Sequence, residues 1–510
     1  MSHGRTLSVG LVGIEGHLVE VEAQLASGLP AFRIVGLPDA SLAEARERVR
    51  AALESCGLTL PTRRVTANLS PAAMPKSGSA FDLALAIAVV ATGHIPQRAA
   101  AADTVHLGEL GLDGRLHPVR GILPMVARAV AAGHPRVVVP IGNLEEASLV
   151  PGAEVVGAAH LGEVFARYGV RTIAPTILAP PAVAPDPAHR ALPDGDLADV
   201  VGQEEARLAL EVAAAGAHHL FLKGPPGAGK TMLASRLPSI LPELSDRDAV
   251  TVTSVHSLAG TLVPGDGLVR RAPFEAPHHT ASRSSIVGGG SGVPRPGAVS
   301  KAHCGVLFLD EAPEFQVAVL QTLRQPLESG EVVLHRANAT ARYPARFQLV
   351  MAANPCPCGL SGSRCTCGGG ERRRYLARLS GPLLDRVDIQ VPVPRVTRAM
   401  AAIGAAGEQS AQVAARVQLA RERQHTRYRD VPWSVNGSAA GTWLRHPDQL
   451  PQAAARRGLE KLVDRGDLTM RGLDRVLRLA WTLADLAGDA RPTPTHLAIA
   501  TTLRMGDPHA

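Results

Sequence analysis

The chain has 510 residues, of which 45% are hydrophobic and 19% are charged, and its formal net charge is +7. This length exceeds one ordinary hydrophobic core, so we expect two or three domains. The composition is that of a globular protein and excludes an intrinsically disordered one. No apolar run reaches the roughly 18 residues that a membrane span requires, and the first residues lack the layout of a secretory signal. We therefore expect a cytoplasmic protein.

The positive charge is concentrated near the C-terminus, since residues 395–510 hold 17 Arg or Lys and 11 Asp or Glu. A basic lobe of this kind is typical of proteins that bind a polyanion such as nucleic acid. A solvated protein face can have the same composition, so charge alone leaves both interpretations open.

Residues 1–172 alternate between strand-like and helix-like segments, which predicts a mixed α/β domain. Gly57 and Gly133 directly follow two amphipathic segments, as is common at helix ends. We expect strands at residues 7–21, 63–69 and 136–140, and helices at residues 39–56, 83–93 and 122–132.

Six prolines interrupt residues 173–197, and no apolar periodicity accompanies them. This composition predicts a semi-rigid linker. Residues 198–395 then have the pattern of a second α/β domain, and residues 396–510 that of a mostly helical one.

The most informative motif is a glycine-rich loop in the second domain. It matches the pattern G-x-x-x-x-G-K-S/T, follows the apolar run 219–222 and precedes a helix-like segment at 232–237. In such a loop the backbone N–H groups face nucleotide phosphates, the lysine reaches the β- and γ-phosphates, and the final hydroxyl can bind Mg²⁺. The motif predicts that ATP or GTP is bound by Gly224, Pro225, Pro226, Gly227, Ala228, Gly229, Lys230 and Thr231.

Two acids, Asp310 and Glu311, follow the apolar run 306–309. This pattern is typical of a buried parallel strand that delivers carboxylates to its C-terminal end. We expect Asp310 to hold Mg²⁺ through water and Glu311 to polarise the attacking water, which favours hydrolysis over mere nucleotide binding. The alternative is an ordinary core strand that ends in surface acids.

Asn354 follows the next apolar run, residues 347–353. A side-chain amide at this strand end can orient the same attacking water between the γ-phosphate and the acid. Taken alone, an asparagine at a strand end is usually a turn residue. Its order after the loop and the acids favours the catalytic interpretation.

These motifs together resemble an AAA+ ATPase, and within that class the chain is identified as a member of the magnesium-chelatase-like YifB/ComM family. The resemblance extends over nearly the whole chain and rests on specific strings at residues 199–203 (DVVGQ), 276–282 (APHHTAS), 287–290 (VGGG), 294–297 (PRPG), 323–328 (LRQPLE), 354–359 (NPCPCG) and 380–386 (SGPLLDR). It implies ATP and Mg²⁺ as ligands, with Val201 and Gly202 beside the nucleotide.

The resemblance also implies roles for two distant arginines. Arg386 matches the arginine finger that reaches the nucleotide of a neighbouring subunit, and Arg471 matches a lid arginine that senses the γ-phosphate. Either residue alone would be interpreted as a surface arginine. A finger that acts on a neighbour requires a head-to-tail ring, and the class implies a homohexamer.

Residues 288–301 resemble a hairpin that such ATPases project into the ring pore. Its glycines would allow a mobile tip, and Arg283, Arg295 and Lys301 are candidates to follow a DNA backbone. The alternative is a surface loop with scattered charge. For the adjacent His278 and His279 we expect structural hydrogen bonds rather than a metal, because neighbours on a strand cannot easily face one ion.

Four of the six cysteines form a cluster with the spacing C-x-C, six residues, C-x-C. Four thiolates within twelve positions suit tetrahedral Zn²⁺, although the pairs are tighter than the usual C-x-x-C. Reduced free thiols and a redox pair are the other interpretations. The candidate zinc ligands are Cys356, Cys358, Cys365 and Cys367.

Residues 1–172 resemble the proteolytic domain of Lon, which uses a serine–lysine dyad. Ser79 lies near the serine position, but Leu123 stands where the lysine is required, and a leucine cannot accept a proton. Lys76 is the remaining candidate for the role of the missing lysine. We expect no protease activity and interpret the domain as a scaffold or docking module.

The resemblance implies a ring-shaped ATPase that acts on DNA, in branch migration or remodelling during recombination or uptake of foreign DNA. The alternative is the motor subunit of a magnesium-chelatase complex, which drives Mg²⁺ into a porphyrin through partner proteins. A non-enzymatic scaffold is a third possibility, against which the intact motif residues argue.

Overall fold

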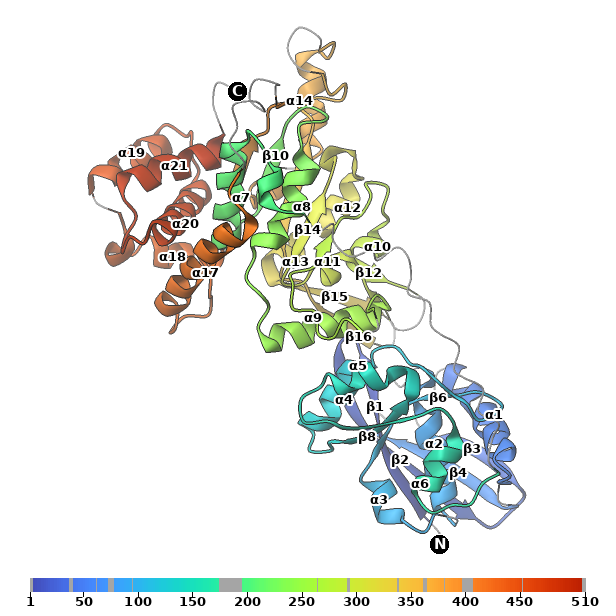
Figure 1. Cartoon of the computed structure of the whole chain (residues 1–510). Helices are drawn as coiled ribbons and strands as arrows, with labels where there is room; N and C mark the ends of the chain where they lie inside the picture. The colour runs from blue at the N-terminus through green and yellow to red at the C-terminus, as the bar shows by residue number, and fades with distance from the viewer. Residues whose placement is uncertain are drawn as a thin grey trace.

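The computed structural model describes residues 3–35, 40–60, 62–71, 78–93, 95–173, 195–263, 265–290, 294–336, 339–360, 365–379, 381–396, 407–451 and 453–506. Two larger sheets and many helices make up these residues, which confirms the α/β class (Figure 1). Residues 174–194 of the expected linker lie outside the described parts. Within the described ranges no helix combines the length and apolarity needed to cross a membrane.

The N-terminal sheet has seven strands in the order β3-β4-β2-β1-β5-β8-β9. Their bounds are β1 His3–Val12, β2 Glu15–Ala26, β3 Ala31–Val35, β4 Arg64–Ser70, β5 Val105–His106, β8 Arg136–Pro140 and β9 Glu154–Ala158. The single strand expected at residues 7–21 is wrong. A turn at Gly13 (φ +66°) splits it into the antiparallel pair β1 and β2, with Leu7 opposite Glu20. Left-handed φ at this turn suits glycine, which has no Cβ.

Helices cover both faces of this sheet because its strands alternate apolar residues between the faces. Helix α2 (Asp82–Ala91) is buried along its whole length and packs with α1 (Ala40–Ser55) and α6 (Leu161–Arg167) on one side. Helix α4 (Ile122–Ala131) packs on the other. The remaining short elements are α3 (Arg98–Ala102), α5 (Leu144–Ser148), β6 (Glu109–Leu110) and β7 (Leu116–His117).

The second sheet is fully parallel and has the order β11-β14-β17-β10-β18. Its strands are β10 (Leu220–Lys223), β11 (Phe274–Glu275), β14 (Val306–Leu309), β17 (Gln348–Ala353) and β18 (Ile389–Pro392). Strands buried on both faces read as continuous apolar runs, which is why the sequence located the central strands closely. All five carboxyl ends meet at one edge of the sheet.

Helices surround the second sheet and two hairpins extend from it. The helices are α7 (Glu204–Gly216), α8 (Lys230–Ile240), α9 (Asp246–Ala259), α10 (Arg283–Val287), α11 (Ala298–Lys301), α12 (Val317–Thr322), α13 (Arg324–Ser329), α14 (Gly369–Ala377) and α15 (Gly381–Leu384). The hairpins pair β12 (Gly288–Gly289) with β13 (Arg295–Pro296) and β15 (Glu331–Arg336) with β16 (Ala339–Pro344). The sequence predicts the first hairpin but not the second.

The C-terminal part is helical, as expected, and packs on α7 (Figure 1) and, through α21, on β18. It comprises α17 (Ser410–Arg427), α18 (Gly441–Leu444), α19 (Ala453–Asp464), α20 (Met470–Ala487) and α21 (Pro494–Met505). One continuous apolar core joins these helices to the second sheet. A polar contact reinforces the junction, because the buried Asp388 accepts from Arg475 of α20.

The N-terminal unit meets the second unit at α9 and at the β15–β16 hairpin (Figure 1). Glu146 accepts a hydrogen bond from Ser257 of α9, and the Ile14 N–H donates to the Arg342 carbonyl over 3.5 Å. The hairpin that the sequence analysis missed therefore forms part of the contact between the two units.

Candidate nucleotide site

A cavity of about 400 Å³ lies at the carboxyl edge of the second sheet. Its lining is Pro226, Gly227, Ala228, Gly229, Lys230, Thr231, Asp310, Glu311, Ala353 and Asn354. These residues come from three segments far apart in the sequence, after β10, β14 and β17, which are neighbours in the sheet. The predicted loop, acids and asparagine thus share one cavity.

The glycine-rich loop is shaped to accept an anion. Gly227 (φ +74°) and Gly229 (φ +89°) have left-handed backbones, and a Cβ on Gly227 would meet no atom within 4 Å. Gly229 caps α8 without a side-chain hydrogen bond, so the first N–H groups of this helix keep their capacity to donate. A helix N-terminus with free N–H groups favours a phosphate group.

Lys230 is almost fully buried within this loop. Its ammonium donates to the Gly224 carbonyl (2.7 Å), to the Pro225 carbonyl (3.0 Å) and to Asn354 Oδ1 (3.2 Å). Burial lowers its pKa, and the nearby carboxylates of Asp310 and Glu311 oppose that shift. The cation is held by weak acceptors that phosphate oxygens can replace.

Thr231 and Asp310 present a suitable pair of oxygens for Mg²⁺. The Thr231 hydroxyl donates to Asp310 Oδ2 over 2.7 Å, so both oxygens face the same point. Hydroxyl, carboxylate and water oxygens are the ligands that Mg²⁺ prefers, so the donor set fits the ion. The other Asp310 oxygen accepts from the Glu311 N–H over 2.9 Å, which fixes the carboxylate.

Glu311 has a strained backbone. Its φ of +49° is rare for a residue with a side chain and costs on the order of 1 kcal/mol or more. Its carboxylate is half exposed and lines the cavity. Strain of this kind is retained where the surrounding structure requires one orientation of a side chain.

His279 is a residue of the site that the sequence analysis did not place there. Its Nδ1 lies 3.4 Å from Glu311 Oε2, and its ring lies against that of His278, with centroids 4.1 Å apart and the planes tilted by 33°. His278 instead bonds to the Thr280 hydroxyl over 2.8 Å, as expected of a structural histidine. Because β11 and β14 are adjacent, the segment after β11 brings His279 to the acid.

Gln203 and Arg395 support the glycine-rich loop from outside. The Gln203 amide donates to the carbonyls of Ala228 (3.1 Å) and Pro394 (2.8 Å), and Arg395 donates to the Pro226 carbonyl (3.1 Å). The sequence analysis did not assign either residue. Val201 and Gly202, which it did assign, precede Gln203 but are not part of the cavity lining.

Arg386 and Arg471 do not line the cavity of their own chain. Arg386 pairs with Glu328 and borders a separate, larger cavity of about 640 Å³ between the second sheet and the C-terminal helices. Burial lowers the pKa of Arg386, and the charges of Arg324, Arg471 and Arg475 lower it further. The arginines therefore form a positive cluster that an anion would stabilise.

The three candidate DNA contacts differ in their surroundings. Arg283 begins α10 and Arg295 lies in β13, and both are exposed. Lys301 belongs to α11 and pairs with Glu275 over 2.8 Å. The expected hairpin at 288–301 is thus too long, because a helix begins after β13.

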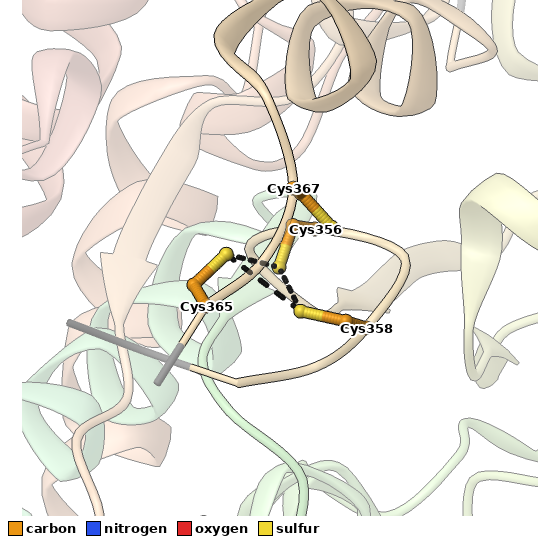
Figure 2. Close-up of side chains that lie close together, drawn as sticks. All are labelled: Cys356, Cys358, Cys365 and Cys367. Atoms are coloured by element: carbon orange, nitrogen blue, oxygen red, sulfur yellow. Dashed lines mark hydrogen bonds between the residues drawn. The ribbon is translucent and has the colours of Figure 1, made fainter. Parts of the chain in front are cut away.

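The four clustered cysteines converge on one point (Figure 2). Their sulfurs all lie within 4.8 Å of one another, and all six cysteines of the chain are free thiols.

In the N-terminal unit, the Ser79 hydroxyl donates to the Glu109 carboxylate, and Leu123 is fully buried in α4. Lys76 lies outside the described residues.

Three family descriptions match the chain. "Magnesium chelatase, subunit ChlI" matches residues 196–401, "Subunit ChlI of Mg-chelatase" matches residues 21–143, and "Magnesium chelatase, subunit ChlI C-terminal" matches residues 407–504. Together they extend over both units and the C-terminal helices.

Relatives that match over their full length identify the family of the chain more closely. The chain is 50% identical over 506 residues to an uncharacterized protein of Mycobacterium tuberculosis, with 99% of each chain covered. It is 39% identical to the competence protein ComM of Haemophilus influenzae (98% of this chain and 96% of that protein) and 38% identical to the uncharacterized protein YifB of Escherichia coli (97% and 96%). The chain therefore belongs to the YifB/ComM family of magnesium-chelatase-like AAA+ ATPases.

Proposed function

We propose that this ATPase is a ring-shaped motor that hydrolyses ATP to move or remodel DNA. The observation that carries the hydrolytic part is the convergence of Lys230, Thr231, Asp310, Glu311 and Asn354 in one cavity. These side chains supply a cation for the phosphates, oxygen ligands for a metal ion, and a base and an amide for the attacking water.

The chain's own residues account for binding and water activation. The loop N–H groups and Lys230 bind the β- and γ-phosphates, while Thr231 and Asp310 would hold Mg²⁺, which would neutralise charge on the phosphates. Glu311 accepts the proton of the attacking water as its oxygen bonds to the γ-phosphorus. The bond from that phosphorus to the bridging oxygen breaks, and ADP leaves with that oxygen. Asn354 orients the water.

Arg386 acts on the nucleotide of the neighbouring subunit in a homohexameric ring, and Arg471 of the C-terminal helices senses the γ-phosphate. Support comes from their position, since both lie away from the Lys230 cavity of their own chain and within a positive cluster. A cluster of like charges is stabilised when a γ-phosphate enters it, and a finger of this type contributes roughly 10³–10⁵ in rate.

DNA is the proposed substrate of the motor. The supporting observations are the full-length similarity to a competence protein, the exposed Arg283 and Arg295 beside the β12–β13 hairpin, and the basic C-terminal residues. We assign Lys301 to the structure rather than to DNA, because its ammonium is paired with Glu275. The physiological process would be branch migration or remodelling during recombination or transformation.

The N-terminal unit is proposed to be a scaffold without protease activity. Its Ser79 hydroxyl donates a hydrogen bond to the Glu109 carboxylate, and the fully buried Leu123 has no group that can accept a proton.

The family descriptions favour one further candidate, the motor of a magnesium-chelatase-like complex. One experiment separates the two candidates. ATPase rates are measured without ligand, with single-stranded or branched DNA, and with a porphyrin plus chelatase partner proteins, for wild type and Glu311→Gln.

We expect DNA to stimulate the wild type severalfold and Glu311→Gln to lose about 10²–10⁴ in rate while retaining ATP binding. Stimulation by the porphyrin system alone would favour the chelatase motor. A wild type that neither binds DNA nor responds to it would refute the DNA proposal, and a fully active Glu311→Gln variant would refute the assigned acid.

A further inference from the structure

We infer that Cys356, Cys358, Cys365 and Cys367 form a structural zinc site that fixes the end of β17 against the glycine-rich loop. The sulfur of Cys356 lies 3.3 Å from that of Cys358 and 3.5 Å from that of Cys365. Cys358 and Cys365 are 3.6 Å apart, and all four sulfurs fall within 4.8 Å of one another (Figure 2).

These distances match tetrahedral coordination. Zinc–sulfur bonds of about 2.3 Å place the sulfurs of a tetrahedron about 3.8 Å apart, whereas a disulfide brings two sulfurs to about 2.05 Å. Among the described residues, the cluster contains four thiols and no other ligand type. Four protein thiolates complete the coordination of Zn²⁺ and leave no position for water, which is the arrangement of a structural site.

The charge around the cluster also suits such a centre. Zinc with four thiolates carries a net charge of about −2, which needs nearby cations. Arg372 lies near Cys365, and the negative charge of that thiolate raises the pKa of the Arg372 guanidinium; Arg373 and Arg374 follow on the same helix, α14. Second-sphere cations of this kind stabilise thiolate ligands.

The chain around the cluster connects it to the nucleotide cavity. Cys356 is buried and lies two residues after Asn354, and a turn closes where the Gly359 N–H donates to the Cys356 carbonyl over 3.1 Å. Gly359 (φ +68°) approaches the glycine-rich loop so closely that a Cβ there would lie 2.7 Å from the Pro226 ring. The cluster therefore packs directly on that loop.

The other end of the cluster leads into α14. Gly368, which follows Cys367, is the N-cap of this helix. At the C-cap, Arg378 donates to Glu314 over 3.4 Å. Glu314 lies three residues after Glu311 in the chain. A metal ion at the four sulfurs would join the ends of β17 and the start of α14 around the cavity. This positioning role rests on the proposed ATPase function, whereas the zinc site itself does not.

The first test is the zinc content of the full-length protein, purified without chelators and measured by mass spectrometry. We expect about one zinc per chain in wild type, below about 0.1 in the Cys358→Ser/Cys367→Ser double variant, and about one in the matched control Cys56→Ser. Among the described residues, Cys56 belongs to the core of the N-terminal unit and to no group of possible metal ligands. Wild type with less than about 0.1 zinc, or a double variant that retains zinc, would overturn the site.

A second measurement keeps the test independent of folding in the variant. Wild type is stripped of zinc and titrated with Co²⁺, which absorbs through thiolate-to-metal charge transfer when four thiolates bind it in a tetrahedron. We expect one equivalent of Co²⁺ to saturate this band and Zn²⁺ to abolish it. If no band appears and all four thiols react at once with a thiol reagent, the cysteines are free thiols and the zinc site is refuted.

The positioning role is tested by steady-state kinetics on the same samples. Loss of zinc is expected to lower kcat about tenfold while KM changes less than about threefold, and zinc addition to the stripped wild type restores kcat. Unchanged kcat after complete zinc loss would overturn the positioning role. The zinc content does not depend on ATP or DNA, so failure of the DNA proposal is recognised separately, by the response of the wild type to DNA.

Discussion

His279 Nδ1 lies 3.4 Å from the Glu311 carboxylate that lines the nucleotide cavity. His279 follows β11 and precedes α10, which leads into the β12–β13 hairpin, so the histidine connects the candidate DNA-binding segment with the candidate catalytic acid. A carboxylate oxygen that contacts an imidazole is less accessible to the attacking water. The contact therefore offers a way in which DNA could control hydrolysis.

The first prediction concerns this contact. We expect His279→Ala to raise the DNA-free ATPase rate about threefold to tenfold and to reduce stimulation by DNA, because an exposed interaction of about 1 kcal/mol is lost. His279→Asn retains a donor and should behave more like wild type. Steady-state ATPase assays with and without DNA check this, and a slower DNA-free rate in His279→Ala would contradict it.

The second prediction concerns the shared site. Arg386→Ala and Glu311→Gln should each be inactive alone, since each lacks one part of every site. In rings mixed at equal ratio, about a quarter of the interfaces combine an intact Glu311 with an intact Arg386 from its neighbour.

We therefore expect the mixture to recover ATPase activity, up to about a quarter of the wild-type rate. Arg386→Ala mixed with Lys230→Ala should recover activity in the same way, whereas Glu311→Gln mixed with Lys230→Ala should stay inactive, because no interface in that mixture is complete. A mixture of Arg386→Ala and Glu311→Gln as inactive as its components would indicate that Arg386 acts within its own chain.

The third prediction concerns the junction between the second sheet and the C-terminal helices. Asp388 is buried, and although burial raises its pKa, the charge of Arg475 and the hydrogen bond with His218 lower it well below the ordinary range. Arg475 also donates to the Arg386 carbonyl over 3.1 Å. Asp388→Ala leaves Arg475 buried without its carboxylate, and we expect a loss of about 3–5 kcal/mol in the free energy of unfolding.

Tryptophan fluorescence reports this unfolding selectively, because the three tryptophans, Trp433, Trp443 and Trp481, all lie in the C-terminal part. Asp113→Ala removes an exposed pair with Arg115 and serves as the control, with an expected change below about 1 kcal/mol. Equal urea midpoints for the two variants would disprove the role of Asp388.

The fourth prediction concerns acid stability of the N-terminal unit. Burial lowers the pKa of His106 to about 3, and its ring nitrogens contact the Thr6 hydroxyl (2.7 Å) and the Tyr168 hydroxyl (2.8 Å). The unfolded histidine titrates near its ordinary value of about 6.5, so protons favour the unfolded state below that pH. The stability from neutral His106 is complete above pH 6.5 and is lost progressively as the pH falls toward 3.

We expect the wild type to lose about 1 kcal/mol more than His106→Gln in this unit between pH 7 and 5.5. Hydrogen exchange of the β1 amides, corrected for the intrinsic pH dependence, measures the difference. Identical pH slopes for wild type and variant would contradict the expected titration of His106.

The fold was predictable where a single local pattern decided it. The runs before Gly224, Asp310 and Asn354 are continuous and apolar, so strands β10, β14 and β17 were located to within one or two residues. The strand predicted at 7–21 failed because Gly13 interrupts a pattern that is apolar on both sides. The β15–β16 hairpin was missed because its strands mix charged and apolar residues without strict alternation.

The amino-acid sequence by itself determined the chemistry of the loop, the acids and the cysteine cluster, because each is encoded by residues that are close along the chain. Only the tertiary structure decided which of them meet. The strand order β11-β14-β17-β10-β18 brings His279, Glu311, Asn354 and Lys230 to one edge and keeps Arg386 away from that cavity. Strand order depends on long-range pairing and core packing, which no local pattern specifies.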